Sequence, residues 1–207
     1  MKLIFAGLGR SGTTSIVEAL DHLQVNTLSQ ETIFPNQPVH THINAVLRGK
    51  EEMDWAIFDG VEAAVGWPLC WLYQEQLAHF PDAHCILNIR DPEGWYNSCA
   101  KAWKVLNIIR NARFISRLRP MQDTLNYLQE FCGGPPQKER WIAAYDQHIA
   151  DVKANVPPER LTVYEVTDGW EPICIHLNKP IPNQPFPHTN TGGDGFRQKV
   201  RAIFGVG

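Results

Sequence analysis

A glycine-rich loop follows the first apolar segment of the chain. Leu3-Ile4-Phe5-Ala6 leads into Gly7-Leu8-Gly9-Arg10-Ser11-Gly12, and Thr13-Thr14 begin a stretch with helical periodicity. In this strand–loop–helix order, backbone N–H groups and the helix dipole face an anion at the helix N-terminus. Glycine lets the backbone approach a phosphate where a Cβ atom would clash. We therefore expect phosphate to bind at Arg10, Ser11, Gly12, Thr13 and Thr14.

Three nucleotide-binding patterns fit this loop to different degrees. Its three glycines satisfy the dinucleotide fingerprint, and Glu31 lies about where the ribose-binding acid of that fingerprint would fall. The spacing over Gly7–Gly12 is also that of a Walker A loop, but Thr13 stands where that loop requires lysine. In the third pattern a basic residue, here Arg10, precedes Gly-Thr-Thr. The loop alone does not decide between them.

A second segment places an arginine and a serine at a spacing that suits anion binding. Arg90 follows the apolar run Cys85–Ile89, and Pro92 suits the first position of a following helix. Ser98 lies two helical turns into that helix, close enough to share an anion with Arg90. Arginine can donate two parallel hydrogen bonds to a phosphate. The alternative is that Arg90 pairs with Asp91 or Glu93 and that Ser98 faces solvent.

Together, the loop and this segment resemble the sulfotransferases that use 3′-phosphoadenosine-5′-phosphosulfate (PAPS), in a short branch with a P-loop-like loop. In that family the loop holds the 5′-phosphosulfate, and its basic residue corresponds to Arg10. An arginine at a strand end and a serine eight residues later bind the 3′-phosphate, and Arg90 and Ser98 match them. The tyrosine that lies near the adenine corresponds to Tyr164.

The end of the chain resembles the family less fully. Residues 168–172, 185–187 and Asn190 resemble the C-terminal part of the short branch. The glycine-rich segment that completes the 3′-phosphate clamp is only echoed, by Gly192–Gly195 and Arg197.

The resemblance implies in-line transfer of a sulfuryl group from PAPS to a hydroxyl or amine acceptor. The nucleotide product is 3′,5′-adenosine bisphosphate (PAP), and no metal is required. Arg10 would stabilise the charge that develops on the bridging oxygen. The chain has few basic residues outside the proposed site, so we expect a small-molecule or glycan hydroxyl as the acceptor rather than a heavily sulfated polysaccharide.

Such a transfer needs a group that takes the proton of the acceptor. Families of this type place a histidine or glutamate at the end of a strand between the two phosphate motifs. Residues 55–58 are predicted to form a buried strand, and Asp59 follows it, so we hypothesise that Asp59 is the general base. Glu62 is the next candidate. His40 and His42 are expected to lie in a loop.

Short apolar segments alternate with helical ones along the whole chain. We expect strands over 3–6, 55–58, 85–89 and 161–164, and helices over 13–23, 68–80, 92–109, 121–132, 139–156 and 172–177. Residues 24–54 should hold loops and one short helix, and another short helix should follow residue 195. This order predicts an α/β fold, a three-layer sandwich around a central, mainly parallel sheet. We expect one domain over residues 1–207.

Ligands of such sheets bind beyond the carboxyl ends of the strands. The glycine-rich loop, Asp59 and Arg90 each follow a predicted strand. We therefore expect these three to converge on one crevice.

The composition of the chain limits its possible partners and cellular location. The chain has 207 residues and a net charge of −3 without a basic block, so we expect no nucleic-acid partner. Five scattered cysteines favour a reducing compartment, and the N-terminus lacks a signal-peptide core. The most apolar stretch, Ala63–Leu72, is too short to span a membrane. We expect a cytoplasmic protein without a membrane partner. The sequence leaves the oligomeric state open.

Three other functions remain open. A P-loop kinase or NTPase needs the missing loop lysine, although Asp59 could imitate its Mg²⁺-holding acid. A nicotinamide or flavin oxidoreductase would explain the glycines but not the Arg90 and Ser98 pair. A nucleotide-binding regulator without catalysis would need only the donor site.

Overall fold

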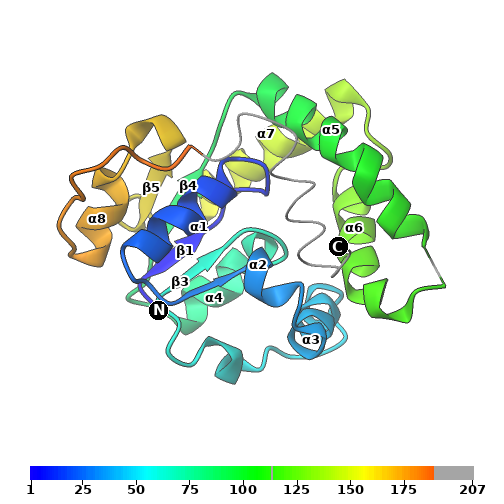
Figure 1. Cartoon of the computed structure of the whole chain (residues 1–207), viewed down its shortest axis with the longest axis horizontal. Coiled ribbons are helices and arrows are strands. Elements are labelled where there is room, and N and C mark those ends of the chain that lie inside the picture. The colour runs from blue at the N-terminus through cyan, green and yellow to red at the C-terminus, as the bar shows by residue number, and fades with distance from the viewer. Residues whose placement is uncertain (113, 189–207) are drawn as a thin grey trace.

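A five-stranded parallel sheet forms the centre of the computed structural model, which describes residues 1–112 and 114–188 (Figure 1). The strands are β1 (Leu3–Phe5), β2 (Thr27–Ser29), β3 (Ala63–Val65), β4 (His84–Asn88) and β5 (Leu161–Tyr164). Their order in the sheet is β2-β3-β1-β4-β5, and each neighbouring pair is parallel. The central strand β1 therefore ends between β3 and β4.

Helices cover both faces of this sheet. Their bounds are α1 (Thr13–His22), α2 (Gln30–Ile33), α3 (Gln37–Leu47), α4 (Tyr73–His79), α5 (Pro92–Asn111), α6 (Arg119–Phe131), α7 (Lys138–Asn155) and α8 (Glu171–Leu177). Side chains alternate between the two faces of a strand. Leu3 and Phe5 accordingly pack with α1 and α8, whereas Ile4 packs with α4 and α7. The predicted α/β three-layer sandwich around a parallel sheet is confirmed.

A second group of helices extends the molecule beyond one end of the sheet. Apolar side chains of α5 and α6 pack against each other, with Leu106 and Leu125 in the same cluster. Helix α3 joins them through Asn44, whose side chain donates a hydrogen bond to the Pro120 carbonyl oxygen (2.7 Å). In Figure 1 α5 and α6 form the right-hand side of the molecule, and α8 lies at the left.

The predicted strand over residues 55–58 is wrong. Trp55–Phe58 forms a 3₁₀ helix that begins after Asp54, whose side chain accepts a hydrogen bond from the Ala56 N–H. The strand that pairs with β1 is β3, a few residues further along the chain. A short apolar run does not by itself distinguish a strand from a helical turn, and the side-chain cap decides the outcome here.

Two other segments differ from expectation. Residues 24–54 contain a strand and two helices, β2, α2 and α3, rather than loops with one helix. The predicted helix over 68–80 is divided into a 3₁₀ turn, Leu69–Leu72, and α4. The other strands and helices predicted up to residue 177 occur close to their expected bounds. The helix expected after residue 195 lies outside the described residues.

Candidate active site

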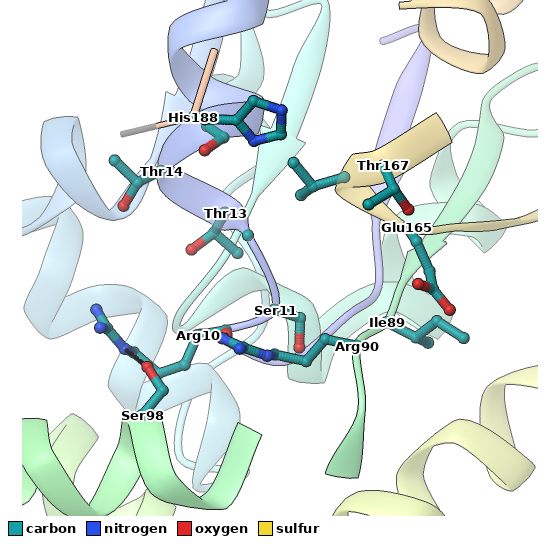
Figure 2. A pocket seen from close by; sticks show the side chains of 13 residues that line it. Arg10, Ser11, Thr13, Thr14, Ile89, Arg90, Ser98, Glu165, Thr167 and His188 are labelled. Carbon is teal, nitrogen blue, oxygen red and sulfur yellow. Dashed lines mark hydrogen bonds between the residues drawn. The ribbon is translucent and has the colours of Figure 1, made fainter. Parts of the chain in front are cut away.

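An open cavity of about 280 Å³ lies at the carboxyl ends of β1, β4 and β5 (Figure 2). It is lined by Arg10, Ser11, Gly12, Thr13, Thr14, Ser15, Ile89, Arg90, Ser98, Glu165, Val166, Thr167 and His188. Its size is near the lower end of ligand pockets, which range over roughly 300–1,000 Å³. Both predicted phosphate-binding segments therefore reach a single cavity.

Asn88, the last residue of β4, holds the glycine-rich loop in place. Its side-chain oxygen accepts a hydrogen bond from the Gly7 N–H (3.1 Å), and its side-chain nitrogen donates to the Ser11 carbonyl oxygen (3.1 Å). Asn88 is 1% exposed, so both bonds are shielded from water. A Cβ atom at Gly7 would lie 2.0 Å from the Asn88 carbonyl oxygen. The first glycine is therefore required for the contact between β4 and the loop.

The backbone of the loop is unusual at two positions. Gly12, which precedes α1, has φ +84°, and a Cβ atom there would lie 2.2 Å from Val166 Cγ2. Arg10 has φ +76°, a conformation that non-glycine residues rarely adopt. The indole of Trp95 on α5 donates a hydrogen bond to the Gly9 carbonyl oxygen (3.0 Å) and so supports the backbone beside Arg10. Such local strain is typical of ligand-binding loops.

The side chain of Arg10 connects the two segments. Its Nε donates a hydrogen bond to Ser98 Oγ (3.0 Å), and both side chains lie together in Figure 2. Burial lowers the pKa of Arg10, and the nearby Arg90 guanidinium lowers it further. Two cations held close together repel each other, so an anion between them is stabilised.

Hydrogen bonds to the backbone of Arg90 hold it in place, and its side chain faces the loop. The Tyr145 hydroxyl on α7 accepts a hydrogen bond from the Arg90 N–H (2.9 Å) and donates one to the Arg90 carbonyl oxygen (3.1 Å). Arg90 Nη1 donates to the Arg10 carbonyl oxygen (3.2 Å). The structure thus brings Arg90 and Ser98 to the same cavity, with Ser98 bonded to Arg10.

The first turn of α1 completes the anion-binding surface. Its first intrahelical hydrogen bond runs from the Ile16 N–H to the Gly12 carbonyl oxygen. The N–H groups of Thr13 and Thr14 precede that bond and have no acceptor within the helix. They lie on the cavity side at the positive end of the helix dipole. Arg10, Arg90 and this helix N-terminus together form a positive surface that can hold an anion.

Tyr164 is not among the residues that line the cavity. It is fully buried in the core beside α1 and α8, its hydroxyl donates to the Gly169 carbonyl oxygen (3.0 Å), and burial raises its pKa. The chain reaches the cavity one residue later, at Glu165, and again at Thr167. The expectation that Tyr164 contacts a bound nucleotide is therefore not supported.

Asp59 lies at the opposite end of the sheet from the cavity. It follows a 3₁₀ helix and precedes β3, whereas the loop follows the parallel strand β1. The Glu62 carbonyl oxygen accepts hydrogen bonds from Lys2 N–H and Leu3 N–H, which fixes this segment at the start of β1. The structure therefore does not place Asp59 after a strand or among the residues that line the cavity, which is the position that the general-base hypothesis assumed.

The other sequence candidates for the base are also not among the residues that line the cavity. The Glu62 side chain pairs with Lys2 Nζ (2.8 Å), which lowers the pKa of that carboxyl group. His40 and His42 lie on α3 rather than in a loop. His40 is buried beside Thr124, and burial lowers its pKa to about 4. His42 lies 2.8 Å from a Glu51 carboxylate oxygen.

A second groove adjoins the first turn of α1. It measures about 590 Å³ and is lined by Thr14, Val17, Glu18, Asp21, Val25, Asn26, Thr27, Ser29, Glu31 and Thr32. Thr14 lines both the cavity and this groove. At Gly66, which follows β3, an added Cβ atom would contact both Gln30 and Thr13, so the start of α2 adjoins the start of α1. Glu31 is therefore a carboxylate at the same end of the sheet as the loop.

Asn88, Glu165 and Tyr145 are among the residues at the site that the sequence analysis missed. Asn88 could have been found, because it is a polar residue at the end of an apolar strand, as Arg90 is. Glu165 follows β5 in the same way. Tyr145 gives no such signal, since a tyrosine on a helix is more often part of the core.

The described residues also bear on the expectations for disulfides, metal sites and membrane-spanning helices. Its five cysteines are buried and unpaired. Within residues 1–112 and 114–188 no cluster of three or more His, Cys, Asp or Glu side chains is suited to a metal ion. Nor is any described helix both long and apolar enough to cross a membrane.

Comparison with known proteins identifies the family. A sulfotransferase domain family model matches residues 2–195, nearly the whole chain. The chain belongs to this sulfotransferase domain family. It is also similar to the "Ava biosynthesis cluster protein M" of Aspergillus versicolor, with 25% identity over 220 residues, which cover 95% of this chain and 84% of that protein.

Proposed function

We propose that the protein transfers a sulfuryl group from PAPS to a hydroxyl or amine group of a small molecule. The observation that carries this proposal is the single cavity in which Arg10, Arg90 and Ser98 meet the N-terminus of α1. A nucleotide with phosphates at both its 3′ and 5′ positions offers two anions to a cavity that holds two arginines and a helix N-terminus. Glycine at Gly7 and Gly12 fixes the path of the loop beside this cavity, because a Cβ atom there would clash with Asn88 or Val166.

In this proposal the cavity residues bind and orient the donor. The Thr13 and Thr14 N–H groups and the Arg10 guanidinium would bind the 5′-phosphosulfate end. Arg90, with Ser98, would bind the 3′-phosphate. Arg10 has a further task, because negative charge moves onto the oxygen between phosphorus and sulfur as the sulfuryl group leaves. A fixed cation there stabilises the transition state more than the ground state.

We further propose that Glu31 replaces Asp59 as the general base. Glu31 lines the groove that shares Thr14 with the donor cavity, so an acceptor in this groove would approach the loop from the side of α1. The carboxylate would take the proton from the acceptor oxygen or nitrogen as that atom attacks sulfur. General-base catalysis of this kind contributes about 10²–10⁴-fold to a rate.

The name of the relative favours a small-molecule acceptor over a glycan. That protein is named for a biosynthesis cluster. The groove beside α1 mixes apolar, hydroxyl and acidic side chains. Such a lining suits a compact acceptor with a polar group to orient and an apolar body to cover.

A kinase or NTPase activity is less well supported by the geometry. Thr13 occupies the position of the Walker A lysine, and Asp59 lies at the wrong end of the sheet to hold Mg²⁺ beside the loop. Of the two strands beside β1, β3 is followed directly by Gly66 and β4 by Ile89 and Arg90.

The direct test is turnover with ³⁵S-labelled PAPS in EDTA buffer, using a panel of small alcohols, phenols and amines. We expect labelled product from at least one acceptor together with release of PAP. The Arg10→Ala variant should lose this turnover, whereas Arg48→Ala, at the far end of α3, should keep it. PAPS consumption that requires Mg²⁺, or turnover that is unchanged in Arg10→Ala, would contradict the proposal.

A further inference from the structure

Three large apolar side chains are exposed where α5 ends and α6 begins. Phe114 is fully exposed (101%), Ile108 is 70% exposed and Ile115 is 46% exposed. We call these three residues the apolar tip. The neighbouring core is complete without them, since Ile109 and Leu118 already fill the contact between the two helices. Exposed apolar groups gathered in one place are more often an interaction surface than a structural necessity.

The same segment concentrates positive charge. Between residues 94 and 122 the sequence has six basic residues and no acidic one, although the whole chain carries a net charge of −3. The basic residues are Lys101, Lys104, Arg110, Arg113, Arg117 and Arg119. Lys104, Arg117 and Arg119 are exposed beside the tip. Apolar side chains flanked by cations are the combination that binds the surface of an anionic lipid bilayer.

We propose that the apolar tip and the exposed basic residues beside it, Lys104, Arg117 and Arg119, bind the surface of an anionic membrane. Phe114 and the two isoleucines would enter the boundary between headgroups and acyl chains, and the cations would attract the headgroups. The two parts support each other, because a few apolar side chains alone bind weakly and charge alone is screened by salt. This binding is peripheral, without a spanning helix, and it revises the expectation that no membrane is involved.

The location of the tip leaves the donor cavity accessible. Ser98 and Ile108 lie on the same helix, separated by about 15 Å at 1.5 Å per residue. In Figure 1 this end of α5 is at the right-hand edge of the molecule, and α8 is at the left. A membrane on the tip would therefore bring the enzyme to the bilayer by a surface separate from the donor cavity. The proposal does not depend on which reaction the cavity performs.

Co-sedimentation with vesicles tests the proposal on the full chain. The vesicles contain either phosphatidylcholine alone or phosphatidylcholine with about one-quarter phosphatidylserine. We expect binding to the anionic vesicles only, weakened at least fivefold when NaCl rises from about 50 to about 500 mM. Phe114→Ser should lower the partition coefficient about tenfold, since it removes the largest inserted side chain. Arg119→Glu should lower it by a similar factor.

The chain offers a matched control for the apolar substitution. Ile175 on α8 is 64% exposed, but α8 itself carries no lysine or arginine, so Ile175→Ser should leave vesicle binding unchanged. Phe114 is fully exposed, and an unchanged melting temperature would show that Phe114→Ser keeps the fold. The proposal is overturned if the wild-type protein does not sediment with anionic vesicles, or if Phe114→Ser and Ile175→Ser bind equally. Concentration-dependent dimerisation that Phe114→Ser abolishes, without vesicle binding, would instead make the tip an interface between two copies of this chain.

Discussion

The charged residues at the two ends of the central sheet have different surroundings. At the carboxyl end, Arg10 and Arg90 surround a cavity and are held by hydrogen bonds to the loop, to Ser98 and to α7. At the amino end, Glu62 pairs with Lys2, and Asp59 ends a 3₁₀ helix. At the amino end Glu62 forms an ion pair with Lys2, whereas at the carboxyl end two arginines line the same cavity. A charged residue next to an apolar segment therefore indicates a ligand-binding site only if that segment is a strand and the residue lies at its carboxyl end.

The largest difference in turnover is expected between two variants, each of which replaces one carboxylate by its amide: Glu31 at the carboxyl end of the sheet and Asp59 at the amino end. Glu31→Gln should lower kcat by about 10²–10⁴-fold while PAP binding is retained, because it removes only the proposed base. Asp59→Asn should leave kcat close to that of the wild type. Steady-state kinetics and calorimetry on the two variants measure this difference. A loss of turnover in Asp59→Asn alone would reverse the assignment of the two ends.

The next effect concerns the affinity for the donor. Arg90→Ala should weaken PAP binding about 10- to 100-fold, because a charge-assisted hydrogen bond in a partly desolvated site contributes about 1.5–3 kcal/mol. The matched substitution at the amino end, Lys2→Ala, should leave PAP binding unchanged. Isothermal calorimetry at constant ionic strength gives both values. Equal affinities for the two variants would remove Arg90 from the site.

A smaller effect on stability should arise at Asn88, which joins the loop to β4. Asn88→Ala leaves the Gly7 N–H and the Ser11 carbonyl oxygen buried without their partner. We expect the free energy of unfolding to fall by about 1–3 kcal/mol per unsatisfied group. Urea denaturation with and without PAP measures the loss. Asn155→Ala, at the C-terminal end of α7, provides a control in which an exposed side-chain hydrogen bond is removed, and it should cost much less.

The smallest effect is a pH dependence at the amino end. His84, the first residue of β4, stacks on His176, and both imidazoles lie within hydrogen-bond distance of the Thr162 hydroxyl. Burial, with the neighbouring His176, lowers the pKa of His84 to about 4 from its ordinary value of 6.5. The unfolded chain therefore binds a proton in this pH window that the folded chain does not, so stability falls as the pH drops from 6.5 to 4.

His84→Gln should make that decline shallower, while PAP binding at pH 7 stays the same. Chemical denaturation at several pH values between 4 and 7 provides the comparison. His22→Gln, at the end of α1, controls for the loss of a histidine outside the stacked pair. An identical decline in His84→Gln and the wild type would show that the stacked pair does not titrate in this range.

Much of the fold and part of the site follow from local sequence rules. The loop, Arg90 and Ser98 could be placed because each belongs to a strand, turn or helix with a clear sequence pattern. The three-layer arrangement followed from the alternation of such segments. These rules use neighbours in the sequence, which is why they succeeded at 3–14 and 85–98.

The errors arose where tertiary contacts decide the outcome. Trp55–Phe58 is apolar like a strand, but the cap from Asp54 and the pairing of β3 with β1 move the strand further along the chain. Tyr164 was assigned correctly to a strand, but its side chain points into the core, because successive side chains of β5 face opposite sides of the sheet. Asn88 forms hydrogen bonds with residues far away in the sequence, and no local pattern reveals these partners.

The central claim is that the carboxyl end of the sheet binds a nucleotide with phosphates at both the 3′ and 5′ positions. The most direct measurement is calorimetric titration of the protein with PAP in EDTA buffer, beside ATP with Mg²⁺ and NADPH. We expect PAP to bind without metal and more tightly than either of the other ligands. Binding of ATP with Mg²⁺, or of NADPH, with no heat from PAP, would contradict the claim and favour a kinase or an oxidoreductase instead.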